Sequence, residues 1–185
     1  MKKIVCLAAT MAVILCLTAC TKYSTDKDKY LSFARENKVM PVEVDLGDYT
    51  CFHTLCYPDM GLDNYTLIAC YDNAQYQKEK EKVQERYIFE TEALYDPVEQ
   101  HQLESKFTLG EYEFSLLDAE EHGCDCDPPE SYFIGFNDKK HQIAYVYYAD
   151  RSLDVVYSYE DILIDKCGWS IAVFRAEDLS KRMKT

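Results

Sequence analysis

The chain has 185 residues and a formal net charge of −13, with 20 Lys and Arg against 33 Asp and Glu. This acidic surplus argues against nucleic acid as a partner, because no basic excess is present to displace the counterions of phosphates. It also opposes binding of the protein body to anionic lipid, and the length fits a single domain with a sizeable core.

The first twenty residues have the layout of a secretory signal. Lys2 and Lys3 are followed by an apolar stretch over 4–17, and small residues then lead to a cysteine in Leu17-Thr18-Ala19-Cys20. This cleavage site resembles the lipobox of bacterial lipoproteins. The resemblance implies that residues 1–19 are removed and that Cys20, the new first residue, carries lipid on its sulfur. The alternatives are an ordinary signal peptide and an uncleaved N-terminal anchor.

The resemblance also implies a location. We expect the protein to lie outside the cytoplasm, anchored to the cell membrane through the lipid on Cys20. Residues 20–29 then form the lipidated cysteine and a tether, and residues 30–185 form a single α+β domain. An extended tether of this length spans about 30 Å and would hold the domain away from the bilayer.

The periodicity of apolar residues predicts an alternation of helices and strands in the first half of the chain. The elements follow in order as a helix over 26–38, strands over 42–46, 49–57 and 65–71, and a polar helix over 73–84.

The second half is predicted to be richer in strands. Residues 86–94 fit helix and strand equally, and 107–117 reads as two short strands or one strand bent at Gly110. Residues 132–136 and 142–148 are apolar on both faces, which indicates central strands covered on each side. A short capped helix before Gly168, a strand over 169–174 and a helical tail over 177–184 complete an α+β domain. Its sheet is mainly antiparallel, and its few short helices lie mainly on one side.

One loop concentrates groups that bind metals. His122, Cys124 and Cys126 lie among several carboxylates, and sulfur with imidazole suits a transition metal. Two cysteines one residue apart fill only half of a tetrahedral site, so Cys51 and Cys56 would have to complete it. The simpler interpretation is a solvated acidic loop. We therefore predict no cofactor, with a transition metal at these three residues as the alternative.

Six cysteines remain after Cys20, and an even number in an exported protein suggests disulfides without defining the pairs. Cys70 and Cys167 lie in apolar segments and are predicted to be buried thiols. Cys124 and Cys126, in a polar loop, are expected to react first.

No enzyme signature is present: the chain contains no His-Glu-x-x-His, no Gly-x-Ser-x-Gly and no glycine-rich phosphate loop. A Cys–His pair that includes His53 stays open, because such partners meet only in three dimensions. The many tyrosines fit strand packing or a recognition surface. We expect a non-catalytic binding module for a protein or cell-envelope ligand. The alternative is a thiol-based metal or redox protein that uses the Cys124/Cys126 loop.

Overall fold

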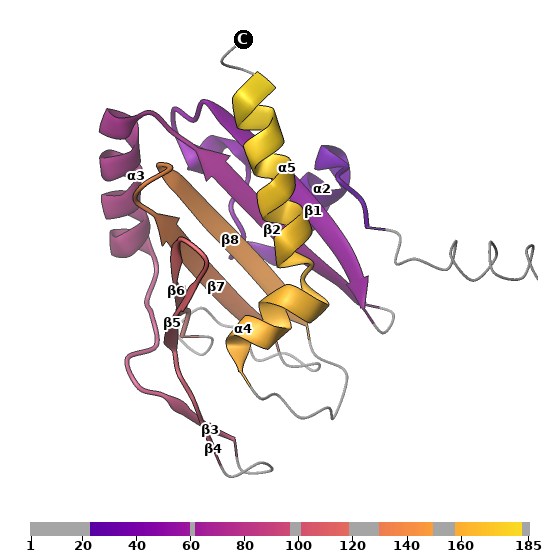
Figure 1. The fold of residues 1–185 in the computed structure, drawn as a ribbon, viewed down its shortest axis with the longest axis vertical. Coiled ribbons are helices and arrows are strands. Elements are labelled where there is room, and N and C mark those ends of the chain that lie inside the picture. Colours follow the sequence, from indigo (N-terminus) through magenta and orange to yellow (C-terminus); the bar gives the residue numbers. More distant parts are fainter. Residues whose placement is uncertain (1–22, 60–61, 97–100, 119–129, 150–157, 183–185) are drawn as a thin grey trace, which may run out of the picture.

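The computed structural model describes residues 23–59, 62–96, 101–118, 130–149 and 158–182 (Figure 1). The elements are α2 (Lys27–Asn37), the 3₁₀-helix η1 (Glu43–Leu46), β1 (Cys51–Asp59), β2 (Leu62–Cys70), α3 (Asn73–Arg86), β3 (Leu94–Asp96), β4 (His101–Leu103), β5 (Lys106–Leu109), β6 (Tyr112–Leu116), β7 (Glu130–Asn137), β8 (Gln142–Ala149), α4 (Tyr159–Asp161), the π-helical turn η2 (Ile162–Lys166) and α5 (Trp169–Arg182).

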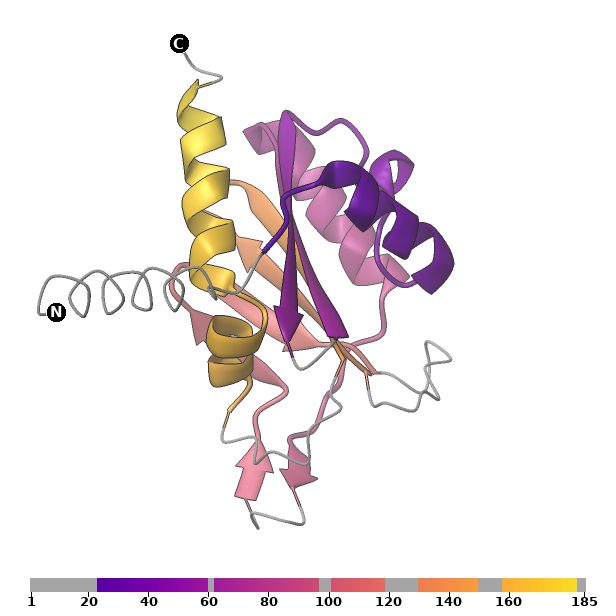
Figure 2. The same cartoon turned by 90° about the vertical axis from the view of Figure 1, so that its right-hand side faces the viewer.

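A six-stranded antiparallel sheet with the strand order β1-β2-β8-β7-β6-β5 forms the centre of the molecule, and β3 and β4 form a separate two-stranded ribbon. The α+β class with a mainly antiparallel sheet is confirmed. The helices, however, cover both faces of the sheet rather than mainly one. Figure 2 shows α2 and α3 on one side and α4 and α5 on the other, because the inner strands are apolar on both faces and each face must be buried.

The hairpin of β7 and β8 lies in the middle of the sheet, as its sequence predicts. The register pairs Phe133 with Val146 and Phe136 with Ile143. Ile143 packs in the core under α2 and α3, whereas Val146 packs in the core under α5, and both side chains are fully buried. The alternation of side chains along a strand therefore supplies both cores from one element.

Residues 42–46 do not form the predicted strand. The backbone N–H of Val42 donates to the Asp45 carboxylate at 2.9 Å, and η1 ends at Gly47, whose φ is 65°. Val42 and Leu46 pack together with the core under α2, while Val44 is 87 % exposed. Apolar residues four apart fit one helical turn as well as the alternation of a strand, and local capping selects the turn.

The predicted strand over 169–174 is also wrong, because α5 runs continuously from Trp169 to Arg182. Trp169, Ala172 and Ala176 are buried against the sheet, and their spacing of three and four residues marks one face of a helix. Residues 177–182 of the predicted helical tail form the second half of this helix, and 183–184 lie outside the described residues. Gly168, with φ of 64°, separates α5 from the short helix before it.

Three smaller expectations are resolved by the structure. Between α3 and β3 the chain forms neither a helix nor a regular strand. Phe89, within this segment, forms a single β-bridge with Leu117. Residues 106–116 form two strands joined at Gly110. Ser24 pairs with Cys56, and α2 begins at Lys27, so most of the segment 24–29 assigned to the tether forms part of the fold.

Candidate functional site

The outer side of β1 is an edge of the sheet. Ser24 exchanges two backbone hydrogen bonds with Cys56, at 2.8 and 2.7 Å, and no other bridge joins this side of β1 to the described part of the chain. Backbone groups alternate in direction along an antiparallel strand. The N–H and C=O groups of Phe52 and Thr54 therefore point the same way as those of Cys56, toward the open edge.

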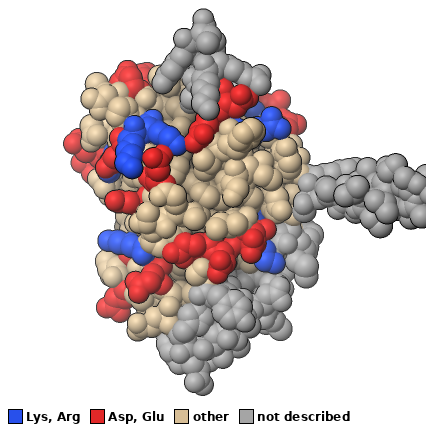
Figure 3. Space-filling model, viewed as in Figure 1, with Lys and Arg blue, Asp and Glu red and all other residues tan. Residues whose placement is uncertain are grey.

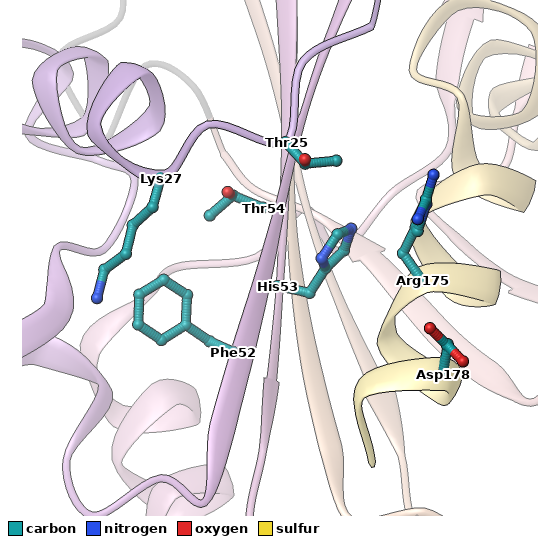
Figure 4. A pocket seen from close by; sticks show the side chains of 7 residues that line it. All are labelled: Thr25, Lys27, Phe52, His53, Thr54, Arg175 and Asp178. Carbon is teal, nitrogen blue, oxygen red and sulfur yellow. The ribbon is translucent and has the colours of Figure 1, made fainter. Parts of the chain in front are cut away.

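A cleft of about 280 Å³ lies beside this open stretch, between the start of α2 and the outer part of α5 (Figure 4). In Figure 4, His53 points toward α5, whereas Phe52 and Lys27 lie on the α2 side. The cleft is lined by Thr25, Lys27, Phe52, His53, Thr54, Arg175 and Asp178. We call it the β1-edge cleft.

Two cations and one carboxylate line the β1-edge cleft. The ammonium group of Lys27 lies 4.3 Å from the centre of the Phe52 ring and 3.2 Å from the carboxylate of Glu43. The guanidinium of Arg175 donates to the hydroxyl of Tyr23 at 3.1 Å. The lining is therefore more cationic than a chain of net charge −13 would suggest.

His53 is the one titratable side chain buried at the floor of the β1-edge cleft. It is only 8 % exposed, and its Nε2 has no hydrogen-bond partner among the described residues. Burial, with a smaller effect of the nearby Arg175 charge, lowers the pKa of His53 to about 4. The imidazole is therefore neutral at pH 7, and its Nε2 is a buried polar atom without a partner among the described residues.

Of the residues singled out by sequence, His53 lines this cleft. Cys20, His122, Cys124 and Cys126 lie outside the described residues. Within the described ranges no group of three or more His, Cys, Asp or Glu side chains is arranged to hold a metal ion.

Cys51 and Cys56 cannot complete one metal site together with His53. Side chains alternate along β1, so Cys51 and His53 face the α5 side, whereas Cys56 packs in the core under α2. Burial raises the pKa of the Cys56 thiol, although the neighbouring Lys29 opposes the shift. Cys56 is therefore a protonated core thiol rather than a nucleophile.

The remaining buried cysteines also serve as core residues. Cys70 and Cys167 are 5 % and 1 % exposed, which confirms their predicted burial. The Sγ atom of Cys70 accepts a hydrogen bond from Gln142 Nε2 at 3.4 Å, and the hydroxyl of Tyr112 donates to the other end of the same amide at 2.6 Å.

A second cavity, of about 360 Å³, lies between α3 and η1. Both of its cations are already paired within the chain: Lys82 contacts Glu79 at 2.6 Å and Arg86 contacts Asp45 at 3.2 Å. The β1-edge cleft combines charge with backbone groups that pair with no other residue in the described ranges, and it is therefore the stronger candidate site.

The clustered tyrosines do not form a recognition surface within the described ranges. Tyr145, Tyr147, Tyr148 and Tyr159 are all buried, which favours the packing interpretation. Sequence reasoning missed Lys27 and Arg175, because no sequence signal links two residues so far apart on elements of uncertain type.

Comparison of the chain with protein-family models, curated proteins and solved structures finds no match. Among the described residues, none of the helices has both the length and the apolar character needed to cross a bilayer.

Proposed function

We propose that this protein is a membrane-anchored lipoprotein outside the cytoplasm. In this proposal it acts as a non-catalytic binding module whose β1-edge cleft takes an extended, carboxylate-bearing segment of a partner protein. The observation that carries the proposal is the open stretch of β1. There, backbone groups of Phe52 and Thr54 that pair with no other described residue face a cleft that contains two cations.

An extended segment suits the geometry of the edge. Exposed strand edges bind peptides by adding a strand, with backbone hydrogen bonds for affinity and side-chain pockets for specificity. Among the described residues only Ser24 pairs with this edge, and the chain then turns away into α2, whose first turn is capped by Asp26. A bound segment would continue the pairing along Thr54 and Phe52.

The charges of the cleft favour a carboxylate on that segment. Arg175 and Lys27 lie on opposite sides of the open edge. An acidic side chain or a C-terminal carboxylate bound between them would therefore have a cation on each side. A guanidinium is well suited to this role because its planar donors match the two oxygens of a carboxylate.

A binding role also fits the chemistry of the nearby side chains. His53, with a pKa of about 4, is a weak base. The pKa of Cys56 is raised by burial, so its thiolate is scarce at neutral pH. Neither group is prepared for acid–base or nucleophilic catalysis.

The experiment is a screen of acidic extended peptides against purified residues 21–185, followed by affinity measurement on variants. Thr54→Pro removes the N–H that faces the open edge, and proline is tolerated there because this N–H is outside the β1–β2 ladder. We expect a loss of affinity of about tenfold or more. Thr54→Val keeps the N–H and a similar shape, and should bind as the parent does.

A second pair of variants tests the charge. Arg175→Glu should weaken binding of acidic peptides, whereas Lys106→Glu, an exposed charge reversal on the opposite edge strand, should not. Equal affinities for Thr54→Pro and Thr54→Val, with folded protein in both cases, would refute the edge-strand site.

A further inference from the structure

The distance between the expected lipid anchor and the folded domain is short. This inference rests on lipid attachment at Cys20, which is part of the proposed function. Ser24 is held on β1 by two backbone hydrogen bonds to Cys56. The four residue steps from Cys20 to Ser24 span at most about 14 Å even when fully extended. A lipidated Cys20 therefore brings the bilayer surface close to this side of the domain.

The same end of the chain is held against α5. Tyr23, the residue before Ser24, accepts a hydrogen bond from the guanidinium of Arg175 at 3.1 Å. Three residue steps separate Cys20 from Tyr23, a span of about 11 Å at most. The hydrogen bond between Tyr23 and Arg175 therefore places α5 within a short reach of the anchor point.

Phe174, on the outer side of α5, is an exposed apolar side chain next in sequence to Arg175. Phe174 is 68 % exposed and Tyr23 is 37 % exposed, while Ile171, one turn before Phe174, is partly buried. Figure 3 looks onto this face and shows a broad uncharged surface with acidic and basic side chains above and below it. Phe174 does not line the β1-edge cleft, so it is directed to another part of the surface.

We propose that this outer side of α5, with Phe174 at its centre, rests on the bilayer surface to which Cys20 is anchored. Aromatic side chains favour the membrane interface, and Arg175 can keep its charged head among the lipid headgroups. The contact is weak alone, but the anchor holds the two surfaces at a high effective concentration. The net charge of −13 makes a zwitterionic bilayer a better partner than an anionic one.

This orientation also determines how far from the membrane a partner would bind in the β1-edge cleft. Arg175 belongs both to the cleft and to the α5 contact with Tyr23. In this orientation the Arg175 side of the cleft lies near the headgroups, and an extended segment bound there lies close to the membrane surface.

The test uses the full mature lipoprotein in phosphatidylcholine vesicles with and without bromine on the acyl chains. The single native tryptophan, Trp169, is buried and supplies a shared baseline. Phe174→Trp places a second tryptophan on the proposed contact. Ile88→Trp is the matched control: Ile88 is 49 % exposed, and it lies beside β6, four strands from β1.

We expect brominated lipid to quench Phe174→Trp about twofold more than the parent protein, and to leave Ile88→Trp at the parent value. Aqueous acrylamide should show the opposite order. Equal quenching of the two variants, in protein that floats with the vesicles, would overturn the α5 contact while leaving the anchor intact. Protein that does not float with the vesicles would overturn both the anchor and the contact.

Discussion

At the scale of single residues, His53 has the clearest pH-dependent consequence. Its pKa is about 4 in the fold, against about 6.5 in an unfolded chain. The unfolded state therefore binds the proton more readily between these two values. Stability that is complete above pH 6.5 should decrease as the pH falls toward 4, by at most about 3 kcal/mol.

Urea melts at several pH values test this expectation. His53→Gln has no titrating group at this position, so its free energy of unfolding should vary less between pH 6.5 and pH 4.5 than that of the parent. The carboxylates of Asp63 and Asp138 have lowered pKa values and titrate at the acid end in both proteins. Parallel pH profiles for the two proteins would show that His53 is not buried in its neutral form.

Gly47 is a second position where one residue decides local structure. Its φ is 65°, and a Cβ added there would overlap the carboxylate of the buried Glu79. Gly47→Ala should therefore combine backbone strain with displacement of Glu79, and we expect a loss of more than about 1–3 kcal/mol of stability.

Gly110 supplies the matched control for Gly47. It has the same φ of 65°, but a Cβ added there would meet nothing within 4 Å. Gly110→Ala should thus report the backbone cost alone. If thermal melts show the two substitutions to be equally destabilising, the contact between Gly47 and Glu79 contributes nothing.

At the scale of elements, β8 supports both layers of the core. Ile143→Ala removes contacts under α2 and α3, and Val146→Ala removes contacts under α5. The first should cost about 2–5 kcal/mol, and the second somewhat less. A total stability of about 5–15 kcal/mol makes both changes measurable by urea denaturation.

Ile88→Ala is the comparison for these core substitutions, because Ile88 is half-exposed and should tolerate truncation with little change. An unchanged urea midpoint for Val146→Ala would mean that α5 does not cover β8. The α5-side core, and with it the position of Arg175 in the cleft, would then be wrong.

At the scale of the whole molecule, Cys20→Ala should abolish lipid attachment and leave the precursor unprocessed by the lipoprotein peptidase. The expectation follows from the Leu17-Thr18-Ala19-Cys20 site, since only the cysteine sulfur can accept the lipid. Detergent phase partition and the mass of the mature N-terminus measure the outcome. Normal maturation of the variant would refute lipid attachment at Cys20. The proposed orientation of α5, which depends on that attachment, would then be refuted as well.

Much of the fold could be predicted from sequence wherever the local pattern agreed with the tertiary environment. The helix before Lys38, the polar helix after Asp72 and the hairpin of β7 and β8 were all predicted. The segments 42–46 and 169–174 were not, because short apolar runs fit both periods. Capping by Asp45 decided the first case, and packing of Trp169 and Ala172 on the sheet decided the second.

The sequence by itself determined the α+β class, the central hairpin and the burial of Cys70 and Cys167, because those depend on local apolar patterns. The tertiary structure alone decided that helices cover both faces of the sheet and that β1 is an edge strand. It also decided that Lys27, His53 and Arg175 share a cleft. The physical reason is that strand order and helix placement follow from burying both faces of the sheet at once. This packing brings residues more than a hundred positions apart close together in space.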